Sequence, residues 1–312
     1  MRAHGSLTLA LILLISTQRP TPAQEPTTTA SGDAYIAEVL AAMERRANVT
    51  AKLRHQSRLG DETLIGSGNF WQLGAGPQRQ TRWEMQSSLG DKPASYVQVF
   101  DGRYLWTDRN LPSGRQTHRL DVTNLKTRLR VASADQTVPT GWESLLRDAE
   151  FRGGMSQMLA ELLRRFHFDP PRAKQLNGFA VEALVGHWRP DQFAELCPVA
   201  GADQPWPEQL PHHVLVLVSQ NNLFPHVIEY RRADDAPLAT IPSGLELAHD
   251  PLVRYEIFEV RFADAIDATV FQFKPGDVDW SDETSLVFDK LNKQQGVAEA
   301  QLAARKAEQR SK

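Results

Sequence analysis

Apolar and polar residues alternate in short segments along most of this chain. In residues 51–59, Leu53, His55, Ser57 and Leu59 fall on one side, and basic or polar residues fall on the other. A period of two is typical of a β-strand with one buried face. Similar segments follow at residues 64–73, 79–85, 95–107, 179–187, 214–218, 226–232, 253–262 and 269–273.

These segments are joined mainly by short turns, which antiparallel strands permit and parallel strands do not. We therefore predict one strongly curved antiparallel sheet of about ten strands. A soluble sheet of this size must hide its edges, and curling into a barrel around an inserted helix would do so. The fold class is thus mainly β with added helices.

The dipeptide Asp101-Gly102 predicts a two-residue hairpin turn within the segment SYVQVFDGRYLWT. Such a turn would place Val99 opposite Tyr104 and Val97 opposite Trp106. These four apolar residues would then share the inner face of the sheet, with Gln98 and Arg103 outside.

Helical spacing appears in two places. Asp33 can cap a helix with apolar residues at positions 36, 39, 40 and 43. In residues 143–166 the apolar positions are again three and four apart, and Gly153-Gly154 divides the segment into two predicted helices. We expect this second segment to pack against the inner face, with the glycines as a hinge.

The first residues have the features of a secretory signal peptide. Residues 7–15 are apolar, Thr21-Pro22-Ala23 offers small residues for cleavage, and the alternative is a buried helix. No cysteine follows to carry a lipid anchor. We predict a signal peptide at 1–23, a leader at 24–32, one domain at 33–288 with insertions near 192–211 and 234–251, and a polar tail at 289–312.

Composition excludes some functions. The net charge of −3 gives no basic surface for nucleic acid. The single cysteine, Cys197, cannot form an internal disulfide. We expect a monomer in the periplasm or outside the cell.

Evidence for catalysis is weak. No nucleophile elbow, phosphate-binding loop or HExxH motif is present. The adjacent residues His212 and His213 would point to opposite faces of a strand, and His55 suits a core or rim position. We expect no enzyme activity, metal or cofactor. A hydrolase without a recognisable motif remains an alternative, which turnover of an acyl ester would reveal.

Several motifs, in order, resemble the LolA-like family of outer-membrane lipoprotein carriers. They are Gly68-Asn69-Phe70-Trp71, Arg82-Trp83-Glu84-Met85, Val99 to Trp106, Phe224 to Tyr230 and Phe271 to Val278. The similarity is greatest to secreted paralogues of planctomycete-type bacteria.

This resemblance implies a half-open β-barrel with a helical lid over an apolar cavity. The ligand would be a lipid or an acylated lipoprotein, exchanged with donor or acceptor proteins of the envelope. Alternation shows which side chains point inward but not whether the interior is hollow. A filled interior would instead favour a protein-interaction module. The predicted cavity residues are Leu53, Trp83, Met85, Val97, Val99, Tyr104, Trp106, Met155, Met158 and Leu162.

One motif departs from the family pattern. LolA carriers have an Arg-Pro pair before the tryptophan strand, and that arginine ties the lid shut. Gly76-Pro77 stands here instead. Arg79 and Arg82 are the nearby candidates for the same role.

Overall fold

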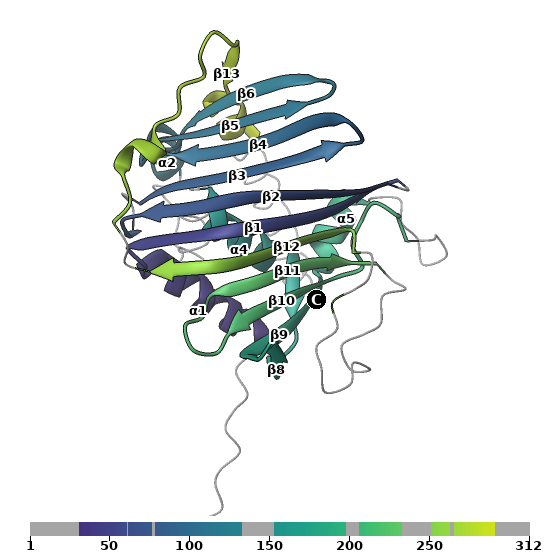
Figure 1. Ribbon diagram of the computed structural model, residues 1–312. Coiled ribbons are helices and arrows are strands. Elements are labelled where there is room, and N and C mark those ends of the chain that lie inside the picture. The colour runs from purple at the N-terminus through teal and green to yellow at the C-terminus, as the bar shows by residue number, and fades with distance from the viewer. Residues whose placement is uncertain are drawn as a thin grey trace, which may run out of the picture.

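One large sheet with helices on its inner face forms the body of the protein (Figure 1). The computed structural model describes residues 31–60, 62–76, 79–132, 153–197, 206–232, 247, 251–262 and 265–290. The helices are α1 (Gly32–Arg45), α2 (Val122–Ala132), α4 (Gly154–Arg165), α5 (Pro190–Leu196) and the 3-10 helix η3 (Ala268–Phe271). The strands are β1 (Asn48–Leu59), β2 (Glu62–Leu73), β3 (Gln80–Leu89), β4 (Lys92–Phe100), β5 (Tyr104–Leu111), β6 (Gly114–Asp121), β7 (Phe166–Phe168), β8 (Arg172–Leu176), β9 (Phe179–Trp188), β10 (His213–Ser219), β11 (Pro225–Arg231), β12 (Val253–Phe262) and β13 (Trp280–Asp282).

The described strands form a single 13-stranded sheet in the order β13-β6-β5-β4-β3-β2-β1-β12-β11-β10-β9-β7, with β8 also paired to β9. Neighbours are antiparallel except β13 and β6. β1 pairs with β12, and this joins the first six strands to the later ones. The predicted fold class, a curved and half-open antiparallel sheet with helices, is confirmed, with more strands than expected.

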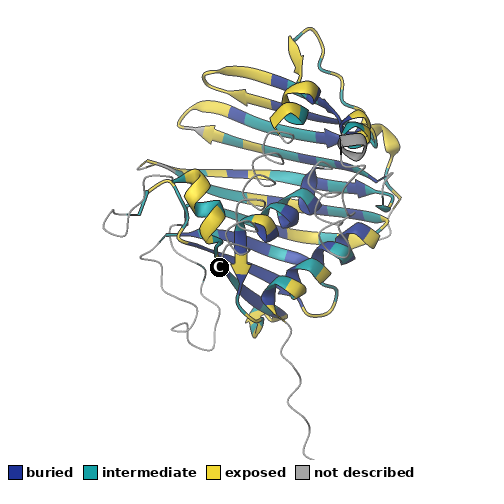
Figure 2. Ribbon diagram, turned by 180° about the vertical axis from the view of Figure 1, so that it is seen from behind, coloured by how far each residue is buried: buried dark blue, intermediate teal, exposed yellow. Residues whose placement is uncertain are grey.

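Helices α1 and α4 cover one face of the sheet, which we call the inner face (Figure 2). Ile36, Val39, Leu40 and Met43 are fully buried, as the helical spacing predicts. The predicted cap is wrong: the Ser31 side chain accepts from the Ala34 amide at 3.2 Å. Asp33 lies inside the first turn. Its carboxylate instead accepts from the Phe168 amide (2.7 Å) and from Arg189 (2.7 Å).

Two side chains of the sheet hold the C-terminal end of α1. The Gln72 amide donates to the carbonyls of Met43 (3.1 Å) and Arg46 (2.7 Å), which the helix itself leaves without partners. Arg79 is fully buried and lies 2.7 Å from the Glu44 carboxylate. Arg79 therefore ties the start of β3 to α1, whereas Arg82 faces outward and bonds to Glu84 and the Val270 carbonyl.

Helix α4 begins at the predicted glycine pair and crosses under the sheet. Gly153 and Gly154 have φ values of 70° and 61°, in the left-handed region that favours glycine. A Cβ on Gly154 would lie 2.9 Å from the Phe70 ring. The helix ends at Arg165, and Phe166 belongs to β7. Of the predicted helical segment 143–166, residues 143–152 lie outside the described part.

The turn between β4 and β5 differs from the prediction. Phe100 pairs with Leu105 and Val99 pairs with Trp106, so four residues, not two, form the loop. The Asp101 carboxylate accepts from the amides of Arg103 (2.8 Å) and Tyr104 (2.7 Å). The aspartate thus shapes a wider loop and shifts the register by two residues, which leaves the alternation of faces unchanged.

The face assigned to this hairpin was wrong. Val97, Val99, Tyr104 and Trp106 do share one face, but it is the outer one, where they pack with Trp71, Phe271 and Phe273. Residues 265–273, including η3, cover that face. Gln98 points inward instead, toward α4. The sheet is therefore apolar on both sides in this region.

The remaining segments are only partly described. The expected insertion near 192–211 overlaps the end of α5 and a loop that resumes at 206. Most of the expected insertion at 234–251 lies outside the described residues, as do the predicted signal peptide, most of the leader and most of the tail. The predicted domain boundaries stay predictions.

Candidate functional site

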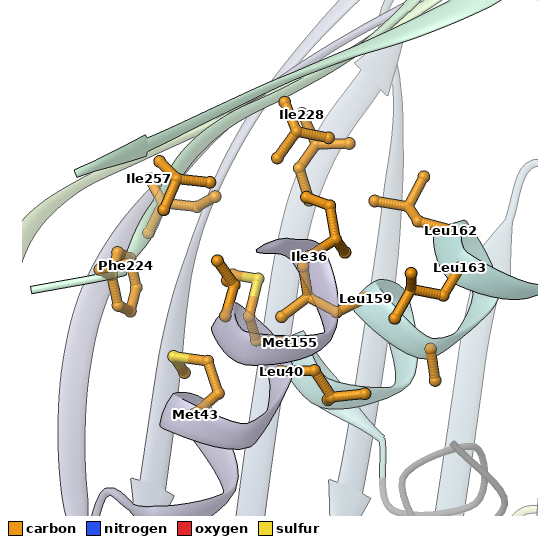
Figure 3. Close-up of a cluster of buried hydrophobic side chains, with 14 of the residues drawn as sticks. Ile36, Leu40, Met43, Met155, Leu159, Leu162, Leu163, Phe224, Ile228 and Ile257 are labelled. Atoms are coloured by element: carbon orange, nitrogen blue, oxygen red, sulfur yellow. The ribbon is translucent and has the colours of Figure 1, made fainter. Parts of the chain in front are cut away.

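A cavity of about 810 Å³ lies between α4 and the inner face of the sheet. Its sheet wall comes mainly from β1, β3, β4, β11 and β12, with one residue each from β2, β5, β7 and β9, and its helical wall comes from one side of α4. It lies toward the end where β1, β3 and β5 turn into their neighbours. The opposite end of the inner face is filled by α1 (Figure 3).

Aromatic rings make up much of the cavity wall. The rings of Phe166 and Trp188 lie 4.5 Å apart, and the Trp83 and Tyr255 rings lie 6.0 Å apart at 76°. His55, the partner of Tyr255 across β1 and β12, has its ring 4.9 Å from that tyrosine. The planes of these ring pairs are inclined to one another by 33°, 40° and 76°.

Helix α4 lies between the core and the cavity, with one side facing each. Met155, Leu159, Leu162 and Leu163 are buried in the main hydrophobic cluster together with α1. The opposite side presents Gln157, Met158, Glu161 and Arg165 to the cavity. One amphipathic helix therefore closes the core and forms the cavity wall.

Gln98 positions the start of this helix. Its side-chain oxygen accepts from the Gly154 amide at 2.9 Å, and its amide donates to the Gln157 side chain at 3.2 Å. No side-chain cap is present at Gly153. Gln98 thus supplies from the sheet a hydrogen bond that a capping residue would normally give.

The cavity holds few full charges. Burial favours a higher pKa for Glu161, but hydrogen bonds from Arg164 and Arg165 lower it overall, so this carboxylate stays ionised and paired. Burial lowers the pKa of His55, which keeps the imidazole neutral at neutral pH. Burial raises the pKa of Tyr255 to about 12.

The end of the cavity is walled by α5 and the loop over residues 206–212. The Trp188 indole donates to the Pro211 carbonyl at 2.7 Å. The rings of Phe193 and Trp206 stack 4.5 Å apart, and Trp206 lies 4.9 Å from His212. This aromatic contact joins α5 to the loop. Leu196 and Leu111 at the cavity edge are each 45% exposed.

The predicted site residues divide into three groups. Trp83, Met85 and Met158 line the cavity. Leu53, Met155 and Leu162 are buried in the packed cluster with α1. The remaining four lie on the outer face of the sheet and do not line the cavity: Val97, Val99, Tyr104 and Trp106.

Several cavity residues were not predicted. Tyr96, Tyr230 and Tyr255 line it, together with Phe166 and Trp188. Tyr96 alternates in phase with Gln98, on the side that the sequence suggested was outside. Tyr230 ends one of the family-like motifs, which was a usable signal.

The described residues contain no group of three or more His, Cys, Asp or Glu side chains that could hold a metal ion. Cys197 follows α5 and is partly exposed as a free thiol. Within the same residues, no helix is long and apolar enough to cross a membrane.

No protein-family model and no curated protein matches the sequence. Solved structures with a similar fold include the MucA/MucB complex of Pseudomonas aeruginosa, at 11% identity over 78% of this chain and 60% of that one, with a TM-score of 0.36. A conserved protein from Thermus thermophilus has 9% identity over 78% and 97%, with a TM-score of 0.39. A LolA superfamily protein from Nitrosomonas europaea has 13% identity over 78% and 98%, with a TM-score of 0.28.

Likenesses at this level concern the fold alone. This chain spans 63% of the length of another MucB structure, which it matches at 11% identity with a TM-score of 0.37. One of the similar folds is from the LolA superfamily, the family that the sequence motifs resemble. Function must therefore be argued from the cavity.

Proposed function

We propose that this protein binds and carries lipid acyl chains, free or as part of a lipoprotein, in the cavity between α4 and the sheet. The observation that carries the proposal is a cavity of about 810 Å³ with Trp83, Met85 and Met158 in its wall. Protein sites for small molecules commonly measure roughly 300–1,000 Å³ and are lined mainly by apolar and aromatic groups.

The energetics support this function. Each methylene group moved out of water contributes about 0.8 kcal/mol. A chain of sixteen carbons therefore offers on the order of 12 kcal/mol before the costs of ordering and immobilisation are subtracted. Methionine side chains adapt to different ligand shapes. Binding then needs no covalent step, and the proposed role is a carrier without catalysis.

The proposed setting is the periplasm or the cell exterior, reached through the signal peptide predicted at 1–23. The protein would act as a monomer and would receive and deliver its ligand through other envelope components. Helix α5 and residues 206–212 form one end of the cavity.

Titration with a fluorescent fatty acid tests the proposal. We expect saturable binding and a change in tryptophan emission, because Trp83 lines the cavity. Met85→Glu should weaken binding by tenfold or more, which is about 1.4 kcal/mol or more, because it places a carboxylate in an apolar wall. Ile65→Glu is the matched control, since Ile65 is 65% exposed on β2 and lies outside this cavity.

Only folded variants are informative, so the melting temperature of each is compared with that of the parent. Absence of uptake by the parent would rule out the proposal. Equal binding by the parent and a folded Met85→Glu variant would place the ligand elsewhere. In either case a protein-interaction module would become the better interpretation.

A further inference from the structure

The last turn of α4 brings a positive charge to the cavity wall. Glu161 and Arg165 are the charged side chains among the described residues that line the cavity. Arg164 binds both oxygens of the Glu161 carboxylate, at 2.6 and 2.7 Å. Arg165 donates to one of the same oxygens through its Nε, at 2.9 Å. Arg165 is therefore the second cation on a carboxylate that Arg164 already holds.

The terminal nitrogens of Arg165 are accessible to a ligand. Within the described residues only its Nε forms a hydrogen bond, and its side chain is 38% exposed. The end of the helix does not need these nitrogens as a cap. The Leu162 carbonyl accepts from the Phe166 amide. Arg189 donates to the carbonyls of Leu163 (3.1 Å) and Arg165 (2.8 Å). The Nη1 and Nη2 groups of Arg165 can therefore bind an anion in the cavity.

Tyr230 adds a neutral donor beside this charge. It lines the same cavity, and burial raises the pKa of its phenol, which keeps its proton at neutral pH. The charges of Glu161 and Arg165 act on that phenol in opposite directions, which places all three groups close together. A guanidinium group presents paired N–H donors that match the oxygens of a carboxylate or a phosphate. The phenol O–H suits the same oxygens.

The cavity extends from this group along α4. Gly154 and Gln157 at the start of the helix line the same cavity as Arg165 at its end, with Met158 between them. The helix has 12 residues, so its two ends lie about 16 Å apart. We propose that the cavity selects an acyl or alkyl ligand with an anionic head, whose oxygens Arg165 and Tyr230 bind while the chain runs along α4 toward Gly154. This inference rests on the proposed function and specifies its ligand class.

Two ligands with the same chain and different heads test this selection. Dodecanoate and dodecanol are titrated by calorimetry at about pH 8, where the carboxylate is ionised. The readout is the ratio of the two affinities, in which a general effect on the cavity cancels. We expect the parent to bind dodecanoate about tenfold more tightly, because hydrogen bonds between charged groups are stronger than those of a hydroxyl.

Substitutions at the two charged wall residues should move this ratio in opposite directions. Arg165→Gln removes the cation and should bring the ratio close to one. Glu161→Gln removes the carboxylate that competes for Arg165 and should raise the ratio about threefold, which a loss of structure would not do. Arg54→Gln is the matched control, because Arg54 is 61% exposed on β1 and lies outside the cavity.

Dodecyl phosphate distinguishes the two sources of an anionic head. Tighter binding than that of dodecanoate would indicate a phospholipid-derived ligand, and weaker binding would indicate a free fatty acid. Either result supports an anionic head, provided that the ligand binds more tightly than dodecanol.

Equal affinities for dodecanoate and dodecanol would overturn this inference and leave the acyl-chain proposal standing. Binding of neither ligand would overturn both. A ratio that Arg165→Gln leaves unchanged, in a variant that melts at the same temperature as the parent, would refute the placement of the head. An equal effect of Arg54→Gln and Arg165→Gln would refute it as well.

Discussion

The two ends of the inner face of this sheet differ in packing. At the filled end, α1 lies on the sheet, and Ile36, Leu40 and Met43 are fully buried against residues such as Phe224 and Ile257 (Figure 3). At the hollow end, large aromatic side chains and Met158 surround a cavity of about 810 Å³.

The difference lies in what covers each end. Hydrogen bonds from Gln72 and the Glu44–Arg79 pair hold α1 close to the sheet. At the hollow end the cover is α4, whose cavity side has the longer polar residues Gln157, Glu161 and Arg165. Hydrophobic content alone therefore does not decide whether an interior is filled.

The largest expected effect comes from the buried ion pair of the filled end. Glu44→Gln leaves the Arg79 charge buried without its carboxylate, which should lower the free energy of unfolding by about 3–5 kcal/mol. Glu259→Gln is the control, because its pair with Lys52 is about half exposed on both sides and should contribute less than about 1 kcal/mol. Urea denaturation of both variants measures the difference. Similar losses would show that α1 is not held by this pair.

A core truncation on α4 tests the filled end from its other side. Leu159 is fully buried in the cluster with α1. Leu159→Ala should lower the free energy of unfolding by about 3 kcal/mol, because it leaves a void in a packed region. Urea denaturation measures this, and a loss below about 1 kcal/mol would mean that the region is not tightly packed.

Acid should weaken strand β10, none of whose residues lines the cavity. His213 on β10 is buried, and burial, with Arg231, His212 and His187 nearby, lowers its pKa to about 4. Two acidic groups accompany this cluster: Asp169 lies 3.4 Å from His187, and the buried Glu229 lies 2.5 Å from Arg231. The pKa of a histidine in the unfolded chain is about 6.5. Between these values the unfolded chain binds more protons, so the stability contributed by neutral His213 is lost as the pH falls from about 6.5 to about 4.

The expected loss is roughly 2 kcal/mol over this pH range. Denaturation at a series of pH values should give a flatter profile for His213→Gln than for the parent, whatever its absolute stability. His167→Gln is the control, because His167 is exposed. An unchanged slope in His213→Gln would assign the acid sensitivity to other groups.

Much of the fold follows from the sequence pattern. The period of two correctly placed Leu53, Trp83 and Met85 on the inner face. The spacing of three and four predicted α1 and α4, and the glycine pair predicted where α4 begins. These predictions succeed because each segment buries one face against the same interior.

The hairpin after β4 shows where the pattern becomes insufficient. Alternation places Val97 and Val99 on one face of the sheet and Gln98 on the other. It does not by itself show which of the two faces is the inner one. The apolar set points outward because residues 265–273 supply a second apolar layer from far along the chain. The polar Gln98 points inward because its side chain satisfies the start of α4. Both causes are contacts between distant segments, which local patterns do not encode.

The smallest expected effect concerns the neighbour of Leu159 on α4. Met158 points to the cavity, where it is only partly buried, so Met158→Ala enlarges an existing space and does not open a new void. We expect it to lower the free energy of unfolding by less than about 1 kcal/mol, well below the loss for Leu159→Ala, because little packing is removed. Binding of a fluorescent fatty acid should nevertheless weaken about three- to tenfold, since the ligand loses the contact that the thioether side chain offers. The two variants, one residue apart on one helix, thus separate stability from binding. If Met158→Ala destabilised the protein as much as Leu159→Ala, the cavity would be closed in solution and the two ends of the inner face would not differ.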